Sequence, residues 1–214
     1  MSVCVRVSLH ASTSKQIMTN RRIVAVASFI NAGSSTVGFI GYSAAPRLGE
    51  PYTSIGYLAF VVWSVALLPI VLHFYSASDT ASNRTRLATL SVGLSVIASG
   101  VILQTLLFLR VVTPEQTTAW NFASAGGVGL WLILSHSQNK GDLPRGLAWL
   151  GIMIGITWIT AFVLLGASGF PAGGPKVSWV AAIGFGADAT AYFASIGWAI
   201  WLAVTLLRAL ERAP

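Results

Sequence analysis

The stretch IGYLAFVVWSVALLPIVLHFY, residues 55–75, decides the fold class. It contains no Asp, Glu, Lys or Arg over 21 residues. A helix of about 20 apolar residues is long enough to cross the hydrocarbon core of a bilayer, which is about 30 Å thick. The stretch therefore predicts a membrane-spanning helix, and its neighbours in the sequence repeat the pattern.

Composition and spacing predict several such helices. Of the 214 residues, 55% are hydrophobic and only 9% are charged, and the mean hydropathy is +0.74. A soluble domain carries about a quarter charged residues, so lipid must solvate much of this surface. We expect an all-α, polytopic transmembrane helical bundle of about six spans, at residues 23–43, 55–75, 87–109, 117–136, 146–166 and 177–207. The fourth span is the weakest, because Asn121, Ser124 and three glycines dilute it.

The basic residues predict how the bundle is oriented. Lys and Arg gather on the cytoplasmic side of membrane proteins. Six spans place three of the thirteen, Arg47, Arg110 and Lys176, on one side and the other ten on the opposite side. The ten are Arg6, Lys15, Arg21, Arg22, Arg84, Arg86, Lys140, Arg145, Arg208 and Arg212. We therefore expect a cell (inner) membrane protein with both termini inside. The basic residues that flank the spans account for the net charge of +7, so the charge does not indicate a nucleic-acid partner and we expect none.

Three segments follow from this topology. We expect a basic N-terminal cytoplasmic tail at residues 1–22, a transmembrane domain at 23–208 and a short cytoplasmic C-terminus at 209–214. The tail lacks the uninterrupted apolar stretch and the small-residue cleavage site of a signal peptide. Met18 directly precedes the basic cluster, so residues 1–17 are either native or a dispensable extension.

Small residues at four-residue spacing predict close packing between the helices. Lipid tails are as apolar as Leu, so membrane helices associate through close contact and hydrogen bonds. We interpret the rows as packing faces and not as the lining of a pore. They are Ser91–Ser95–Ser99, Ala125–Gly129, Gly151–Gly155, Ala182–Gly186–Thr190–Ala194 and Ala187–Ala191–Ser195.

Asp188 is the leading candidate for a functional residue, because it is the only acidic residue within a predicted span. An ionisable group in a membrane is costly unless it is paired or hydrated, so such residues often mark a site. No Lys or Arg lies inside any span to pair with it. Either Asp188 shares a polar pocket with Tyr192, one turn further on, or it is shallow and capped by Thr190 or a water.

Three amides complete the candidate intramembrane polar site. They are Gln104 in the third span, Asn31 in the first and Asn121 in the fourth. Amides at such positions either line a polar path or bridge two helices through hydrogen bonds. Both interpretations remain open for each of the three.

Two histidines offer a different chemistry. His73 and His136 end the second and fourth spans at the same predicted membrane face, so together they are candidate axial ligands of a single haem b. The alternative is that both are interfacial residues without a partner. The sequence has no zinc-spaced Cys/His cluster, phosphate-binding loop or Ser–His–Asp set, and the cofactor is unknown.

Two short segments carry a resemblance to a known class of proteins. The entry to the fifth span, LPRGLAWLG at residues 143–151, and the exit of the sixth, residues 201–208, resemble small uncharacterised six-span prokaryotic membrane proteins. That class has no established activity. The resemblance therefore implies the fold and nothing about the chemistry.

These features favour a non-enzymatic membrane protein. We expect either an accessory or scaffold subunit of a larger membrane complex or a binder of a lipid-like ligand. The expected partners are the lipid bilayer together with a membrane-protein partner or that ligand. The alternative function is a small proton-coupled transporter or channel that uses Asp188. A redox protein that uses His73 and His136 is a third hypothesis.

Overall fold

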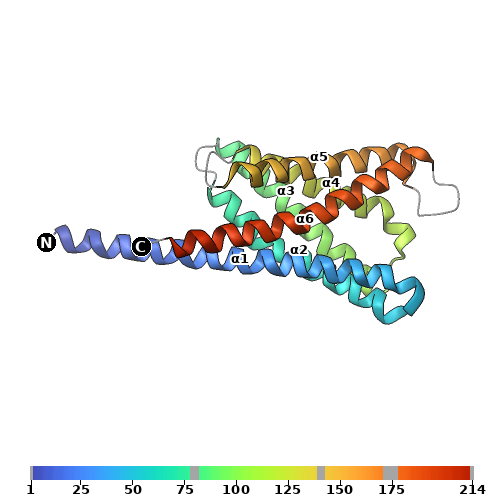
Figure 1. Cartoon of the computed structure of the whole chain (residues 1–214), viewed down its shortest axis with the longest axis horizontal. Coiled ribbons are helices and arrows are strands. Elements are labelled where there is room, and N and C mark those ends of the chain that lie inside the picture. Colours follow the sequence, from blue (N-terminus) through green and yellow to red (C-terminus); the bar gives the residue numbers. More distant parts are fainter. Residues whose placement is uncertain (1, 78–81, 139–142, 171–177, 213–214) are drawn as a thin grey trace.

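The structure, a computed structural model, describes residues 2–77, 82–138, 143–170 and 178–212. Within these ranges all regular structure is helical, which confirms the all-α prediction. The six helices (Figure 1) are α1 (Ser2–Leu48), α2 (Glu50–Ala77), α3 (Asn83–Phe108), α4 (Pro114–Ser137), α5 (Arg145–Ala167) and α6 (Trp179–Glu211). The start of α1 and the end of α6 lie at the same end of the bundle.

Five of these helices are long and apolar enough to cross a membrane. They are the part of α1 from Asn20 to Leu48 and the whole of α2, α3, α5 and α6. Helix α4 falls short because Gln116, Asn121 and its glycines lower its hydropathy. Five of the expected spans thus have matching helices by length and composition. The crossing of the membrane by α4, and the orientation of the termini, stay predictions.

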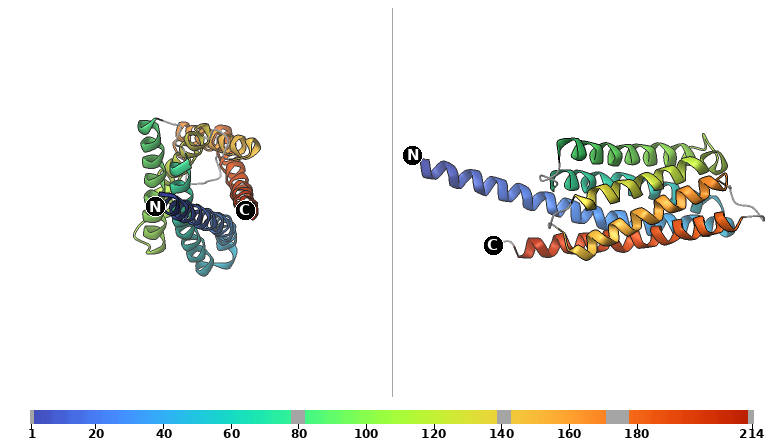
Figure 2. Two further views of the ribbon diagram at one scale, coloured as in Figure 1. Left: turned by 90° about the vertical axis from the view of Figure 1, so that its left-hand side faces the viewer. Right: turned by 90° about the horizontal axis from the view of Figure 1, so that it is seen from above.

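The six helices form a closed ring. Each one packs against the next in the sequence, and α6 packs against α1, an arrangement that the end-on view in Figure 2 shows. The Tyr192 hydroxyl on α6 donates a hydrogen bond to the Ser35 carbonyl oxygen on α1, which links the last helix to the first. Side chains from all six helices can therefore face one common interior.

Helix α1 extends past the end expected from its sequence. We placed the end of the first span at residue 43, before Pro46, because proline disfavours a helix interior. The helix instead continues through Pro46 to Leu48. Gly49 then adopts a φ of +86°, and its N–H bonds to the Ala45 carbonyl oxygen at 2.9 Å. This left-handed glycine cap ends the helix.

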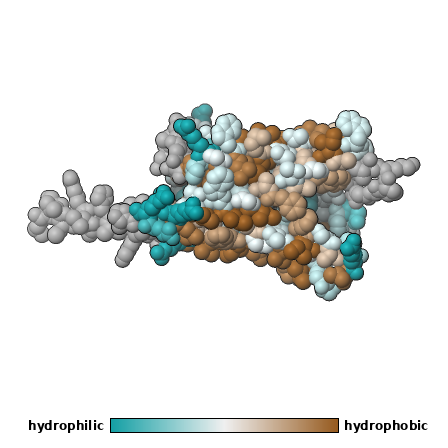
Figure 3. Space-filling view, in the orientation of Figure 1, coloured by the Kyte–Doolittle hydropathy of each residue, from teal (hydrophilic) through white to brown (hydrophobic). Residues whose placement is uncertain are grey.

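Large hydrophobic side chains cover the outside of the ring. Val26, Ile40, Val65 and Val163 are each more than half exposed. In Figure 3 hydrophobic colour dominates the middle of the visible face, and strongly hydrophilic colour lies towards its ends. A monomeric soluble protein rarely exposes so large an apolar surface. The surface therefore fits an integral membrane protein.

The predicted close packing is present where α4 crosses α5. A Cβ added to Gly129 would lie 2.6 Å from the Gly155 carbonyl oxygen, and one added to Gly155 would lie 2.5 Å from the Gly129 carbonyl oxygen. The two backbones thus touch directly, as small residues allow between membrane helices. On α6 the row that contains Ala191 and Ser195 is likewise buried.

Two other rows that we expected to pack do so only in part. Ser99 on α3 bonds to Ser124 on α4, with their hydroxyl oxygens 2.6 Å apart, but the rest of its row is exposed. On α6, Ala194 packs against the hydrophobic core, while the other three residues of its row are exposed. Small size alone therefore does not identify the contacting face. The exposed positions are Ser91 and Ser95 on α3 and Ala182, Gly186 and Thr190 on α6.

We expect Gly155→Ala to lower the stability of the bundle by about 1–3 kcal/mol, because the added methyl group meets the backbone carbonyl of Gly129, which cannot move aside as a side chain could. Gly197→Ala on α6 is the matched control, since a Cβ there meets nothing within 4 Å. Thermal unfolding in detergent, followed by circular dichroism, measures both. Equal melting temperatures for the two variants would contradict the α4–α5 contact.

Because α1 starts and α6 ends at one end of the bundle, six crossings would place both of these ends on one side of the membrane. In a Cys4→Ser background we expect Asn20→Cys and Glu211→Cys to be shielded from an impermeant maleimide added outside intact cells. Glu50→Cys, at the other end, should react. If Asn20→Cys and Glu211→Cys differ in reactivity, α4 does not cross the membrane.

Candidate functional site

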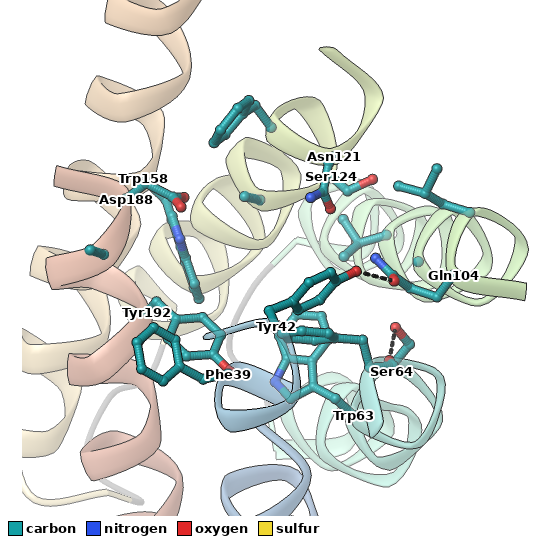
Figure 4. Close-up of a pocket in the computed structure, with 17 residues that line it drawn as sticks. Phe39, Tyr42, Trp63, Ser64, Gln104, Asn121, Ser124, Trp158, Asp188 and Tyr192 are labelled. Atoms are coloured by element: carbon teal, nitrogen blue, oxygen red, sulfur yellow. Dashed lines mark hydrogen bonds between the residues drawn. The ribbon is translucent and has the colours of Figure 1, made fainter. Parts of the chain in front are cut away.

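A cavity of about 340 Å³ lies inside the ring, with all six helices contributing to its wall (Figure 4). It occupies the half of the bundle away from the termini, since its wall includes Phe39 near the end of α1, Phe60 in the first half of α2 and Asp188 in the first half of α6. An apolar cavity of about 150 Å³ holds one benzene molecule. This one has room for a ligand of about two rings.

Aromatic side chains make up much of the wall. Seven of the 17 lining residues are aromatic. Five of these rings are linked by contacts that centre on Phe60 and Tyr192, for example Tyr42 with Phe60 at 5.5 Å and Phe60 with Tyr192 at 6.0 Å between centroids. The seven are Phe39, Tyr42, Phe60, Trp63, Phe122, Trp158 and Tyr192.

Asp188 is part of this wall, about 15 Å along the axis of α6 from the capping residue Ser178. The Trp158 side chain on α5 lies beside the Asp188 carboxyl group, as Figure 4 shows. Among the described residues, no Lys, Arg or His forms an ion pair with Asp188. Thr190 does not cap it, because the Thr190 hydroxyl donates to the Gly186 carbonyl oxygen at 2.8 Å.

Two of the three predicted amides reach the same cavity. Gln104 is buried, and its Oε1 accepts a hydrogen bond from the Tyr42 hydroxyl at 3.3 Å. Asn121 borders the cavity from α4, and its side chain makes no hydrogen bond to any other described residue. Figure 4 shows Gln104 across the cavity from Asp188. Asp188 and the two amides therefore lie on different walls of a cavity that is also lined by seven aromatic side chains.

The remaining two predicted residues link helices. Asn31 lies outside the wall, and its Nδ2 donates to the Trp63 carbonyl oxygen at 3.1 Å, which joins α1 to α2. Tyr192 does both: its ring borders the cavity, and its hydroxyl donates a hydrogen bond to the Ser35 carbonyl oxygen on α1. Of the two interpretations given for the amides, Asn31 therefore fits the one in which an amide bridges two helices.

A buried aromatic plug fills the half of the ring nearer the termini. The plug consists of Phe74, Trp131, His136 and Trp198, each less than a tenth exposed. The ring centroids of Phe74 and His136 lie 5.0 Å apart, and those of His136 and Trp198 lie 5.5 Å apart. The plug lies between the cavity and the end of the bundle that carries the termini.

Both ring nitrogens of His136 are engaged within the plug. Its Nδ1 lies 2.9 Å from the Leu132 carbonyl oxygen, which can only accept, so Nδ1 carries the proton. Its Nε2 therefore accepts the hydrogen bond from Trp198 Nε1, at 3.1 Å. Gly151 makes room for the ring, because a Cβ there would lie 2.6 Å from it.

This geometry bears on the haem hypothesis. A haem iron would have to displace the Trp198 indole from Nε2 of His136. His73 is half-buried on α2, and its ring packs against Phe74 with centroids 6.0 Å apart. The hypothesis stays untested, and nothing in these contacts favours it.

Sequence reasoning did not single out the aromatic wall. Aromatic residues are ordinary in membrane helices, so Phe60, Trp63 and Trp158 carry no signal one at a time. The available signal is their helical phase. Phe60 and Trp63 are three residues apart, and Asp188 and Tyr192 are four apart, so each pair lies on one face of its helix.

No family model matches the chain, and no curated protein and no solved structure matches it either. The resemblance to small six-span prokaryotic membrane proteins therefore stays an expectation. The function has to be argued from the chemistry of the cavity and its surroundings.

We expect Trp198→Phe to destabilise the bundle by about 1–3 kcal/mol, because the buried Nε2 of His136 loses its donor and the smaller phenyl ring leaves a void in the plug. Trp179→Phe is the control, since Trp179 is 75% exposed. Thermal unfolding in detergent provides the measurement. An unchanged melting temperature for Trp198→Phe would show that the hydrogen bond does not hold the plug.

Proposed function

We propose that the protein binds a small, largely apolar ligand inside its ring of helices. The observation that carries this proposal is the cavity, whose wall combines seven aromatic side chains with a few polar groups at separate points. Ligand sites are typically apolar pockets of about 300–1,000 Å³ in which a few polar groups fix the orientation. The cavity lies at the lower end of that range.

The residues at the wall leave the space open. Gly100, Ala125 and Ala189 are small, and each borders the cavity. In the other half of the ring, by contrast, Trp131 and Trp198 fill the interior. Protein interiors are close-packed, so voids larger than a water molecule are few. A space of this size, lined by polar and aromatic side chains, therefore supports the proposal that a ligand occupies it.

The proposed setting is the cell membrane, with both termini in the cytoplasm. The cavity would then open towards the outer half of the bilayer, and the plug would close the inner half. The expected accessory or scaffold role stays a prediction. The surface that such a role would use includes the exposed small residues of α3 and α6.

A second candidate function is a small proton-coupled transporter or channel that uses Asp188. It is supported by the placement of Asp188, Gln104 and Asn121 around one cavity. It requires the plug to open, because a path to the other face must pass His136 and Trp198. Asp188→Asn would then abolish proton-coupled flux in proteoliposomes while expression stays normal. Normal flux in that variant would exclude this mechanism.

To test the binding proposal, we would fill the cavity with Ala189→Phe, since Ala189 is an exposed part of its wall. Ala182→Phe, exposed on the same helix but outside the wall, is the matched control. Small molecules that co-purify in nanodiscs would be identified by mass spectrometry. We expect a ligand in near-equimolar amount in the wild type and in Ala182→Phe, and its loss in Ala189→Phe. An identical set of molecules in all three would contradict the proposal.

A further inference from the structure

The wall of the cavity combines two features that together indicate the charge of the ligand. One is a carboxyl group that forms no ion pair with any described residue, and the other is a cluster of five aromatic rings in contact. The inference rests on the proposed function, because it names the chemical class of the ligand that the cavity takes.

Among the described residues, Asp188 has no cationic partner of the kind that an acidic group at such a position normally has. Intramembrane carboxyl groups usually pair with a basic side chain or face a water-filled cavity. The Trp158 indole lies beside the Asp188 carboxyl group, as Figure 4 shows. A neutral indole donor does not neutralise a carboxylate. A cationic group within the cavity would.

The aromatic rings are arranged to receive such a cation. Phe39, Tyr192 and Phe60 follow one another at 6.0 Å between centroids, and Tyr42 lies 5.5 Å from Phe60. A ring face attracts a cation within about 6 Å of its centroid, and aromatic cages of this kind recognise quaternary ammonium groups. The cavity thus offers several ring faces along with a carboxylate.

The wall fits an aliphatic lipid tail less well. Its branched aliphatic side chains are Val96 and Leu103 alone, although Val, Leu and Ile are abundant on the lipid-facing surface. The polar groups of Gln104 and Asn121 stand away from Asp188, as Figure 4 shows. They suit a hydrogen-bonding group at the far end of a short, rigid ligand.

We propose that the ligand of the central cavity is a small organic cation with an aromatic body. Asp188 is its counter-ion, and the aromatic wall holds its charged group by cation–π contact. Gln104 and Asn121 contact the opposite end of the ligand and orient it.

A pair of isosteric probes tests this directly. Benzyltrimethylammonium and neopentylbenzene have the same shape and differ in a positive nitrogen against a neutral carbon. Their binding to the protein in nanodiscs would be measured by titration calorimetry, with empty nanodiscs as the blank. We expect the wild type to bind the cation at least tenfold more tightly than the hydrocarbon.

Variants of the wall assign the preference to its residues. Asp188→Asn should weaken cation binding by about 30-fold or more, since losing one partner of a buried charge pair costs at least about that factor. It should leave neopentylbenzene binding within about twofold, which also shows that the variant is folded. Asp188→Glu should keep most of the preference, and Ala189→Phe should abolish binding of both probes.

The outcomes separate this inference from the proposed function. If neopentylbenzene binds as tightly as the cation in the wild type, and Ala189→Phe abolishes it, the cavity is a ligand site but the cation inference is wrong. If neither probe shows binding that Ala189→Phe removes, both proposals fail. A cation preference that survives in Asp188→Asn would also overturn the counter-ion role.

Discussion

The direct contact of helix backbones at Gly129 and Gly155 is the constraint on which the rest of the bundle depends. Lipid supplies no hydrophobic force between helices, so association needs close approach and buried hydrogen bonds. Here α4 lies against α5 at the contact distance of their glycines, and the Tyr192–Ser35 bond holds α6 to α1. These contacts keep the ring closed, and a closed ring has an interior that side chains must fill or leave open.

The interior of the ring is filled by side chains in one half and left open in the other. Near the termini, Trp131, His136 and Trp198 fill it, and a hydrogen bond fixes the last two. In the other half the wall includes the small residues Gly100, Ala125 and Ala189, and the space stays open. The same ring therefore supports a stable core and a ligand site, and the plug separates the site from one end of the bundle.

Much of this could be predicted from the sequence, because a charge or an amide stands out in an apolar helix. Asp188, Gln104 and Asn121 were found in this way, and the structure brings them to one cavity. Trp158 and Phe60 were not, since an aromatic residue is unremarkable in a span until its neighbours on other helices are known. The end of α1 at Gly49 and the exposure of Ser91 also depend on context: the first on a left-handed cap, the second on which faces a ring covers.

The central claim is that the open half of the ring is a binding site for a ligand. An experimental structure of the protein in nanodiscs, determined with benzyltrimethylammonium present, tests it most directly. The account predicts density for the probe inside the ring, with its charged group beside Asp188 and the aromatic rings of α1, α2 and α6 around it. A ring interior closed by side chains, with density for the probe only on the lipid-facing surface, would contradict it.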